Sequence, residues 1–460
     1  MIETRKTLIY AGVAVGLALL AFICSPKKIT PDMFVDQGEA FYPEFTDPNE
    51  ARTLEVVEYD DATGSPRAFK VTFENGRWVI PSHHNYPADA QDRLARTAAG
   101  VIDLKKDDYR SDNLADHESF GVVDPLDESA GLAGRGKRVT MKGAGGEVLF
   151  DLIIGNVVTG HPNLRYARLP DQKRVYATRA DVEISTRFED WIDSDLLQLA
   201  KEDVQRVVIN DYTINERTRS VNRRDNLSLR LDGDRWTSAG MSSSNQIDSA
   251  VITDLLATLD DLTIVGIRPK PTGLSVTLKQ ASPEAGLSQS DRISLQQRGF
   301  YMTRDGQLMS NEGELLVTAA NGVRYTLRFG EVVHGSGLAV TAGTDEGSSA
   351  DNSGSAQNRY LFVTTEFLPD MFPEPAKPGD TDFQKKPDSL WSDTDRDNKA
   401  RQDAHLEWQR QVTLGRQTSQ ELNTRFADWY YVISSESFGK LHRSRSELIV
   451  RKTAESSDQG

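Results

Sequence analysis

The chain has 460 residues, 38% of them hydrophobic and 27% charged, with a formal net charge of −15 at pH 7. This composition is typical of folded domains, and the mean hydropathy of −0.51 excludes a channel with many membrane spans. The negative charge argues against nucleic-acid binding, because neutralising phosphates requires clustered Lys and Arg. Cys24 is the only cysteine, so the chain has no pair for an internal disulfide.

The first predicted element is a transmembrane helix in residues 1–28, with residues 8–24 inside the lipid bilayer. This run has no charged residue and is just long enough to cross a hydrocarbon core. A cleaved signal peptide, a lipoprotein signal and an uncleaved signal anchor compete as interpretations. Ile23 before Cys24 suits neither signal peptidase nor a lipobox, and Pro26 hinders cleavage after Ser25. The sequence therefore favours the anchor.

The basic residues Arg5 and Lys6 lie in the short segment before this run. A short basic N-terminus followed by a long domain usually leaves the N-terminus in the cytoplasm. We therefore expect a single-pass protein of the cell (inner) membrane, with its large body on the periplasmic side.

Residues 29–53 are proline-containing and predict a linker, and residues 54–210 follow as a first module. Strand-like segments alternate there with turns such as Asn75-Gly76, a strong hairpin signal. Asp89 is a suitable N-cap for one amphipathic helix. A connector over residues 211–226 leads to the next module.

The landmarks of the first module recur in the same order in residues 227–452. Trp236 follows a strand and a turn as Trp78 does, and the segments around Gly155 and Gly330 are similar and are both followed by two valines. The sequence Thr-Arg-Phe-x-Asp-Trp ends at Trp191 and again at Trp429. Ordered recurrence of this kind indicates an internal duplication.

The second copy contains two predicted insertions. Residues 335–357 are rich in Gly, Ser and Asp and are flexible by composition. Residues 369–420 begin with prolines and continue into a charged helix, for which Gly415 is a natural stop. Residues 453–460 are predicted to be a disordered tail. The fold class is therefore α+β, with an N-terminal transmembrane helix followed by two tandem copies of an antiparallel-sheet-plus-helix module.

Short motifs in the first module resemble those of bacterial proteins that carry the domain of unknown function numbered 4340. In chain order they are Arg77-Trp78, Pro87-Ala88-Asp89, Phe120-Gly121-Val122 with Asp124-Pro125, Ile154-Gly155 and Arg165-Tyr166. The family reads tyrosine and leucine where this chain has Phe120 and Val122, and the second copy lacks the Gly-x-x-Asp-Pro element.

The resemblance implies a membrane-anchored exported protein that serves as an auxiliary component of a gliding-motility-type ABC transporter system. It implies no catalytic residues.

Three other patterns have weak chemical interpretations. His83-His84 is the only histidine pair, but adjacent strand residues point to opposite faces, so a solvated loop is favoured over a metal site. Asp393–Asp397 copies the start of a calcium loop but lacks its Gly and Glu, so helix capping is favoured. Gly131–Gly136 lacks the context of a phosphate loop and is interpreted as a turn. We expect no catalytic, cofactor-binding or metal-binding residues.

The repeated aromatic residues Phe188, Trp191, Phe426 and Trp429, together with Trp78 and Trp236, are interpreted as structural anchors of the repeat rather than as a docking edge. Apolar residues on the charged helix of the second insertion offer a possible partner contact: Leu406, Trp408, Val412 and Leu414. Tryptophan is enriched at interaction hot spots.

We therefore expect a non-enzymatic auxiliary or scaffold subunit of a membrane complex, and the resemblance implies that this complex is ABC-transporter-like, with a permease and an ATPase. The alternative is an envelope module that binds a glycan or a peptide.

Overall fold

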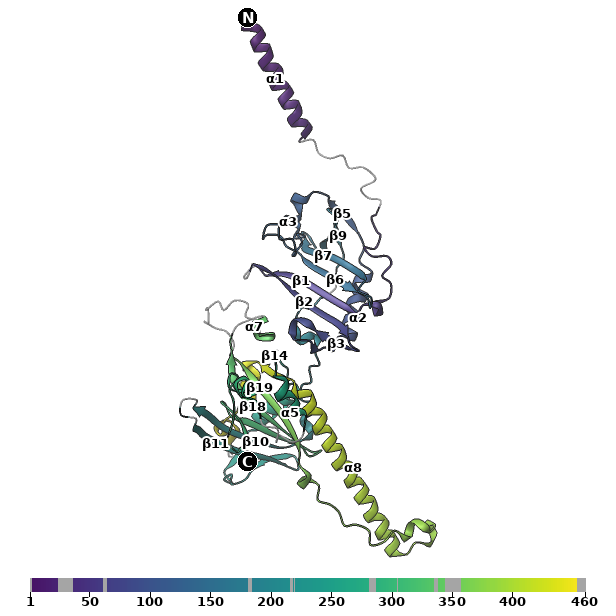
Figure 1. The fold of residues 1–460 in the computed structure, drawn as a ribbon, viewed down its shortest axis with the longest axis vertical. Coiled ribbons are helices and arrows are strands. Elements are labelled where there is room, and N and C mark those ends of the chain that lie inside the picture. Colours follow the sequence, from purple (N-terminus) through teal and green to yellow (C-terminus); the bar gives the residue numbers. More distant parts are fainter. Residues whose placement is uncertain are drawn as a thin grey trace, which may run out of the picture. The chain divides into compact units, whose positions relative to one another are not determined.

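The computed structural model describes residues 2–23, 36–60, 64–180, 184–215, 218, 220–280, 287–303, 305–334, 338–343 and 357–452. The chain divides into two compact units, and Figure 1 shows the elements of both. Unit 1 comprises residues 1–69 and 92–184, and unit 2 comprises residues 70–91 and 185–460. The predicted boundaries of the two sequence modules stay a prediction.

Unit 1 is built on an antiparallel sheet whose strands follow the order β2-β1-β6-β7-β8-β9-β5. Its strands are β1 (Thr53–Asp60), the first half of β2 (Ser65–Glu74), β5 (Asp108–Ser111), β6 (Lys137–Lys142), β7 (Val148–Val158), β8 (His161–Arg168) and β9 (Val175–Thr178). Its helices are α2 (Gln91–Ile102), η4 (Leu114–Asp116) and α3 (His117–Phe120). In α2, the buried residues Leu94, Ala98 and Val101 form one helical stripe.

The predicted linker differs from the structure in its second half, which packs on unit 1. Phe41 and Phe45 are buried, and the hydroxyl of Tyr42 donates a 2.6 Å hydrogen bond to the carbonyl of Asp151. Aromatic burial of this kind stabilises a segment that proline content alone marks as a spacer. Residues 24–35 of the expected linker lie outside the described residues.

Unit 2 contains an eight-stranded antiparallel sheet of order β12-β11-β10-β17-β18-β19-β20-β14. These strands are β10 (Val204–Asn215), β11 (Ser220–Asp232), β12 (Arg235–Ser238), β14 (Gly266–Pro269), β17 (Glu314–Ala319), β18 (Val323–Val333), β19 (Asn358–Phe367) and β20 (Trp429–Ile433). Shorter strands are β3 (Arg77–Ile80), β4 (Tyr86–Pro87), β13 (Asn245–Ile247), β15 (Phe300–Met302), β16 (Leu308–Ser310) and β21 (Ile449–Arg451).

The α-helices of unit 2 are α4 (Ser249–Asp260), α5 (Thr272–Lys279), α6 (Gln289–Gln296), α7 (Leu338–Thr341), α8 (Asp393–Ala427), α9 (Ser435–Leu441) and α10 (Arg445–Leu448). Its 3-10 helices in the described residues are η3 (Pro81–His83), η5 (Phe188–Trp191), η6 (Lys201–Asp203), η7 (Pro369–Met371), η8 (Asp382–Lys385) and η9 (Asp388–Leu390), whereas η2 (Pro48–Glu50) belongs to unit 1.

The strands of the two sheets follow the same order. The order β1-β6-β7-β8-β9-β5 corresponds to β10-β17-β18-β19-β20-β14. The hydrogen-bond register agrees as well: Val157 pairs with Arg165 after an irregularity in β7, and Val332 pairs with Arg359 after an irregularity in β18. A repeated bulge in a repeated strand order places equivalent residues in both units.

The predicted connector over residues 211–226 is a hairpin in the structure. It is formed by the end of β10 and the start of β11, with Asn215 opposite Ser220. Most side chains of the β11 half of this hairpin are exposed, so its sequence shows no apolar alternation of a half-buried strand. Of the predicted loop 335–357, residues 335–337 and 344–356 lie outside the described residues, as does the predicted tail 453–460.

The prediction of a transmembrane helix over residues 8–24 is wrong. In α1 (Ile2–Ile23), side chains are described only for residues 10–20, and these are exposed. Among the described residues, the structure contains no helix with the length and apolar character to cross a membrane. The α+β class with large antiparallel sheets is confirmed.

The helix of the second insertion does not stop at Gly415. α8 continues through it for 35 residues in all, to Ala427. A Cβ at Gly415 would collide with the ring of Phe367 and lie 2.8 Å from the carbonyl oxygen of Asn321. Gly415 therefore allows α8 to approach β19 closely rather than ending the helix. The buried residues Ser419, Leu422 and Phe426 continue the same packed face.

We predict that Gly415→Ala lowers the free energy of unfolding by about 1–3 kcal/mol, because overpacking against a backbone carbonyl and a ring exceeds the gain in helix propensity. Gly439→Ala in α9 is the matched control. A Cβ there meets no atom within 4 Å, so it should stabilise by up to about 1 kcal/mol. Urea denaturation measures both, and stabilisation by both variants would contradict the packing role of Gly415.

Candidate functional site

Unit 1 contains a pocket of about 420 Å³, lined by polar and apolar side chains. Its walls come from η4 and α3, from the loop that follows α3, and from the end of β8 with its turn. The lining side chains that matter most are His117, Asp124, Asp127, Arg168, Asp171 and Lys173.

Glycines let the loop after α3 lie against the sheet. Gly121 has φ +68°, a left-handed conformation that favours glycine, and a Cβ there would lie 2.7 Å from Asn156 Cγ. A Cβ at Gly155 in β7 would collide with the carbonyl of Phe120 and lie 2.8 Å from that of Gly121. Two residues of the Phe-Gly-Val and Ile-Gly motifs thus make the contact that places the loop.

Arg135 holds the outer part of the loop in one conformation. Its guanidinium donates hydrogen bonds of 2.8–3.1 Å to five backbone carbonyls within residues 124–131. It also lies over the ring of Tyr59, 4.4 Å from the centroid. The wall of the pocket formed by this loop is therefore ordered by one side chain.

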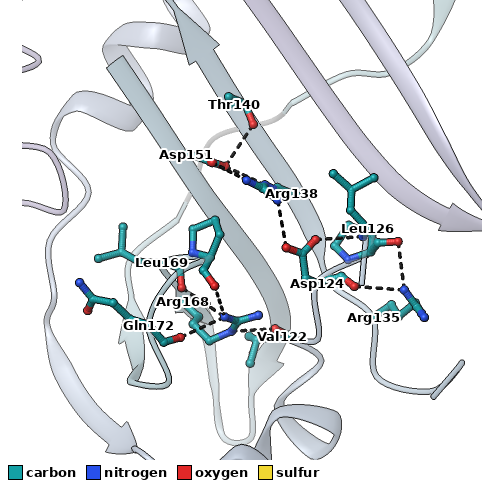
Figure 2. A network of polar contacts seen from close by, with 12 residues as sticks. Val122, Asp124, Leu126, Arg135, Arg138, Thr140, Asp151, Arg168, Leu169 and Gln172 are labelled. Atoms are coloured by element: carbon teal, nitrogen blue, oxygen red, sulfur yellow. Dashed lines mark hydrogen bonds and ion pairs between the residues drawn. The ribbon is translucent and has the colours of Figure 1, made fainter. Parts of the chain in front are cut away.

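A charged network connects the loop to the sheet, as Figure 2 shows. Arg138 donates from Nε and Nη2 to both oxygens of Asp151, at 2.9 and 2.6 Å, and from Nη1 to Asp124 at 3.0 Å. The hydrogen bonds with Asp151 raise the pKa of Arg138. Asp124 also accepts the backbone N–H of Leu126 at 2.9 Å. Both oxygens of Asp124 are therefore already in use.

Arg168 is the buried cation of the pocket, with 6% of its surface exposed. Nε donates to the carbonyl of Val122 at 3.0 Å, and Nη1 donates to the carbonyls of Leu169, Pro170 and Gln172 at 2.8–3.2 Å (Figure 2). Burial lowers the pKa of Arg168. Among the described residues, no carboxylate forms an ion pair in contact with this guanidinium, and the negative charges of Asp124, Asp127 and Asp171 act on it from farther away.

His117 lies beside this cation and is also 6% exposed. Its Nε2 is 2.8 Å from the carbonyl of Lys173, so Nε2 carries the proton in this contact. Burial lowers the pKa of His117, which favours the neutral ring. The neutral ring keeps Nδ1 as an acceptor.

Residues 78–287 match a family model described as a domain of unknown function (DUF4340). The match supports the resemblance to this family. No curated protein and no solved structure matches the chain. The matched range begins at Trp78, includes the whole pocket and ends before α8, so the long helix lies outside it.

The repeat anchors Trp78 and Trp236 occupy equivalent hairpins. Trp78 pairs with Phe73 on β2, and Trp236 pairs with Leu231 on β11. Both are half-buried. They therefore take the same place in the repeated strand order.

The two Thr-Arg-Phe-x-Asp-Trp sequences take different places. The equivalent arginines Arg165 and Arg359 give the alignment, because Arg165 pairs with Thr178 and Arg359 pairs with Ile433. Thr178 and Ile433 are therefore equivalent. Trp429 precedes Ile433 by as many residues as Arg174 precedes Thr178. Trp429 thus occupies the place of Arg174, whereas the first motif follows β9. The motifs are not equivalent positions of the duplicated fold.

Both motifs instead meet within unit 2. Tyr86 packs against Phe188 and Trp429, with ring centroids 5.5 and 5.0 Å apart. Arg425 of the second motif forms an ion pair with Asp193 at 2.8 Å. Phe188, Trp191 and Phe426 are buried. The aromatic residues are core residues of one unit rather than one anchor in each module.

Of the histidine pair, His83 is packed whereas His84 is exposed, so the expected solvated loop is corrected for His83 alone. His83 is 2% exposed and stacks on Phe188 with centroids 4.4 Å apart. Its ring nitrogens lie 2.9 Å from the hydroxyls of Ser82 and Thr341. His84 Nε2 donates to the carbonyl of Ala342 at 2.7 Å. Their partners are protein groups, and within the described residues no group of three His, Cys, Asp or Glu side chains could hold a metal.

The acidic sequence Asp393–Asp397 caps α8. Ser392 and Asp395 form a capping box, and Lys386 contacts both oxygens of Asp395 at 3.0 Å. Hydrogen bonds, first from the Ser392 hydroxyl, lower the pKa of Asp395 to about 2.

The structure separates the four residues of the expected partner contact. Val412 is buried, and Trp408 is half-buried and donates from Nε1 to the carbonyl of Phe372 at 2.8 Å. Leu406 and Leu414 are 52% and 58% exposed. The packed pair holds the insertion together, and the exposed pair remains available to a partner.

We predict that acid destabilises the protein through His83. Burial lowers the pKa of His83 to about 4, so between about pH 6.5 and 4 the unfolded chain binds a proton that the folded one does not. Stability should fall across this window by at most about 3 kcal/mol. His83→Gln should flatten the fall, and His161→Gln, at an exposed site of β8, should not. Equal pH profiles for all three proteins would contradict this.

Proposed function

We propose that the protein is a non-enzymatic auxiliary subunit that binds a partner protein through an arm formed by residues 369–414. The observation that supports this proposal is the exposure of Leu406 and Leu414 on a long helix whose other large apolar side chains are buried or half-buried. Leu390 on the same arm is 70% exposed.

The arm has a small core of its own. Phe383 is buried, and Trp391 Nε1 donates to its carbonyl at 3.0 Å. The amide of Gly379 donates to Asn398 Oδ1 at 3.0 Å. These contacts fix the preceding segment on the first turns of α8, so that the leucines are presented from an ordered surface. An ordered surface loses less conformational entropy on binding than a disordered one.

Only the end of α8 is rooted in the sheet of unit 2, as Figure 1 illustrates for α8 and β19. Thr365 of β19 accepts from Asn423 Nδ2 at 2.7 Å and donates its backbone N–H to Asn423 Oδ1 at 2.8 Å. From Asp393 to Leu414 the helix extends about 33 Å beyond this root. A helix that carries its apolar side chains away from the core suits docking in a groove of a partner.

The family resemblance suggests an ABC-transporter-type complex as the partner. A contact with a permease or its ATPase would place the protein at the cell membrane through protein binding. The alternative, an envelope module that binds a glycan or a peptide, is supported by one observation, the presence of the pocket in unit 1.

The arm can be tested by site-specific photo-crosslinking in the native cell. A photoreactive phenylalanine at position 406 or 414 should crosslink to a transporter subunit, identified by mass spectrometry. Val221 on β11, 39% exposed, is the matched control position and should not crosslink. Crosslinks only between copies of this chain, or equal yields from position 221, would contradict the proposal.

The double variant Leu406→Gln, Leu414→Gln should reduce the recovered partner by about tenfold or more, a loss of at least about 1.4 kcal/mol of binding free energy. Its thermal midpoint should remain near that of the parent, because both side chains are exposed. Full recovery of the partner would assign docking to another surface.

A further inference from the structure

Because the two sheets share the same register, unit 2 shows which side chain can occupy the position equivalent to Arg168. Arg168 lies three residues after Arg165 in β8 and pairs with Ile153. Phe362 lies three residues after Arg359 in β19 and pairs with Arg328. Phe362 is fully buried among Leu274, Leu295, Phe300 and Tyr430. The same position of the same fold thus accepts an apolar side chain, so the fold itself does not require a buried guanidinium there.

Arg168 nevertheless carries a buried charge with an incomplete set of partners. Its Nε and Nη1 bond to carbonyls, whereas Nη2 has no hydrogen-bond partner among the described residues. A buried cation without a contacting counter-ion is costly. An anionic group in the pocket would supply both an acceptor for Nη2 and a counter-ion in direct contact with the guanidinium.

The opposite charge collects at the mouth of the same pocket. Asp127 and Asp171 are exposed and line it, and Lys173 offsets one of their two charges. Asp124 contributes less, because Arg138 and the amide of Leu126 occupy its oxygens. Carboxylates at the mouth repel a ligand with several negative charges and attract an ammonium group.

We propose that this pocket binds a small zwitterion of the amino-acid class, with its carboxylate on Arg168 and its ammonium group toward Asp127 and Asp171. His117 Nδ1 is a further acceptor for the ammonium group. Leu114, Val123 and Pro170 give the carbon skeleton an apolar wall. A volume of about 420 Å³ lies within the usual range for small-molecule sites and has room for such a ligand.

The lining argues against two other ligands of similar size. Among the residues that line the pocket, none is Phe, Tyr or Trp, so a sugar ring would have no aromatic platform on which to stack. A phosphate ester would bring two negative charges past the carboxylates at the mouth. One carboxylate and one ammonium group match the arrangement of charges better than either.

The test is a thermal-shift screen of the full chain with the twenty L-amino acids, followed by calorimetry on those that bind. At least one should bind saturably, and its N-acetyl and carboxamide derivatives should each bind at least about tenfold more weakly, because each loses one charged contact. Absence of binding across the panel, or equal binding of the N-acetyl form, would overturn the proposal.

Two variants assign the contacts. Asp171→Asn should weaken the amino acid while leaving its N-acetyl derivative unaffected, and the exposed Asp103→Asn, outside the lining, should change neither. Arg168→Met should abolish binding of the carboxylate forms, with folding checked by circular dichroism. If Arg168→Met disturbs the fold, the Asp171→Asn comparison decides alone. Unchanged affinity in Asp171→Asn would overturn the assignment.

Discussion

In each unit, two glycines allow a segment of backbone to lie close against the bulged strand of the sheet. Gly121 and Gly155 do so in unit 1, and Gly299 and Gly330 do so in unit 2. Gly299 has φ +79°, and a Cβ there would lie 2.6 Å from the amide nitrogen of Glu331. A Cβ at Gly330 would collide with the backbone of unit 2 just as one at Gly155 would in unit 1. An arginine at the equivalent position of the next strand bonds to the bulge in each unit. Arg165 donates to the carbonyl of Gly155 at 3.4 Å, and Arg359 donates to the carbonyl of Gly330 at 2.8 Å.

Local patterns in the sequence predicted the hairpins and the order of the repeated landmarks, because turn glycines and strand alternation act over a few residues. They could not predict what long-range packing decides. Gly415 has the chemistry of a helix stop and serves instead as a close contact with Phe367. The matching Trp191 and Trp429 suggested one alignment of the motifs, whereas the ladder register shows another. The sequence did not predict the pocket, because its side chains come from three separate segments of the chain. The only hint was Arg168, a charged residue at the last position of β8.

The two copies use the space behind the glycine contact differently. Unit 1 leaves a pocket beside Arg168, and unit 2 fills the equivalent space with Phe362, Phe300 and Tyr430. Unit 2 also buries a cation there: Lys270 Nζ lies 3.9 Å from the centroid of the Phe362 ring. The strand order is therefore the same in the two units, while the side chains next to it differ, as is expected when one fold carries different sites.

Lys270 also connects this aromatic core to the arm. Its Nζ donates to the carbonyl of Phe426 at 2.9 Å, and its backbone N–H donates to that of Asp428 at 2.8 Å, at the end of α8. Burial lowers the pKa of Lys270 well below its usual value. The helix end supplies the negative dipole that a buried amine needs. A cation at this position holds the end of α8 next to β14, while the exposed Leu406 and Leu414 lie in the middle of the helix, before the contact of Gly415 with Phe367. A partner bound there would contact an ordered helix that is continuous with the core of unit 2.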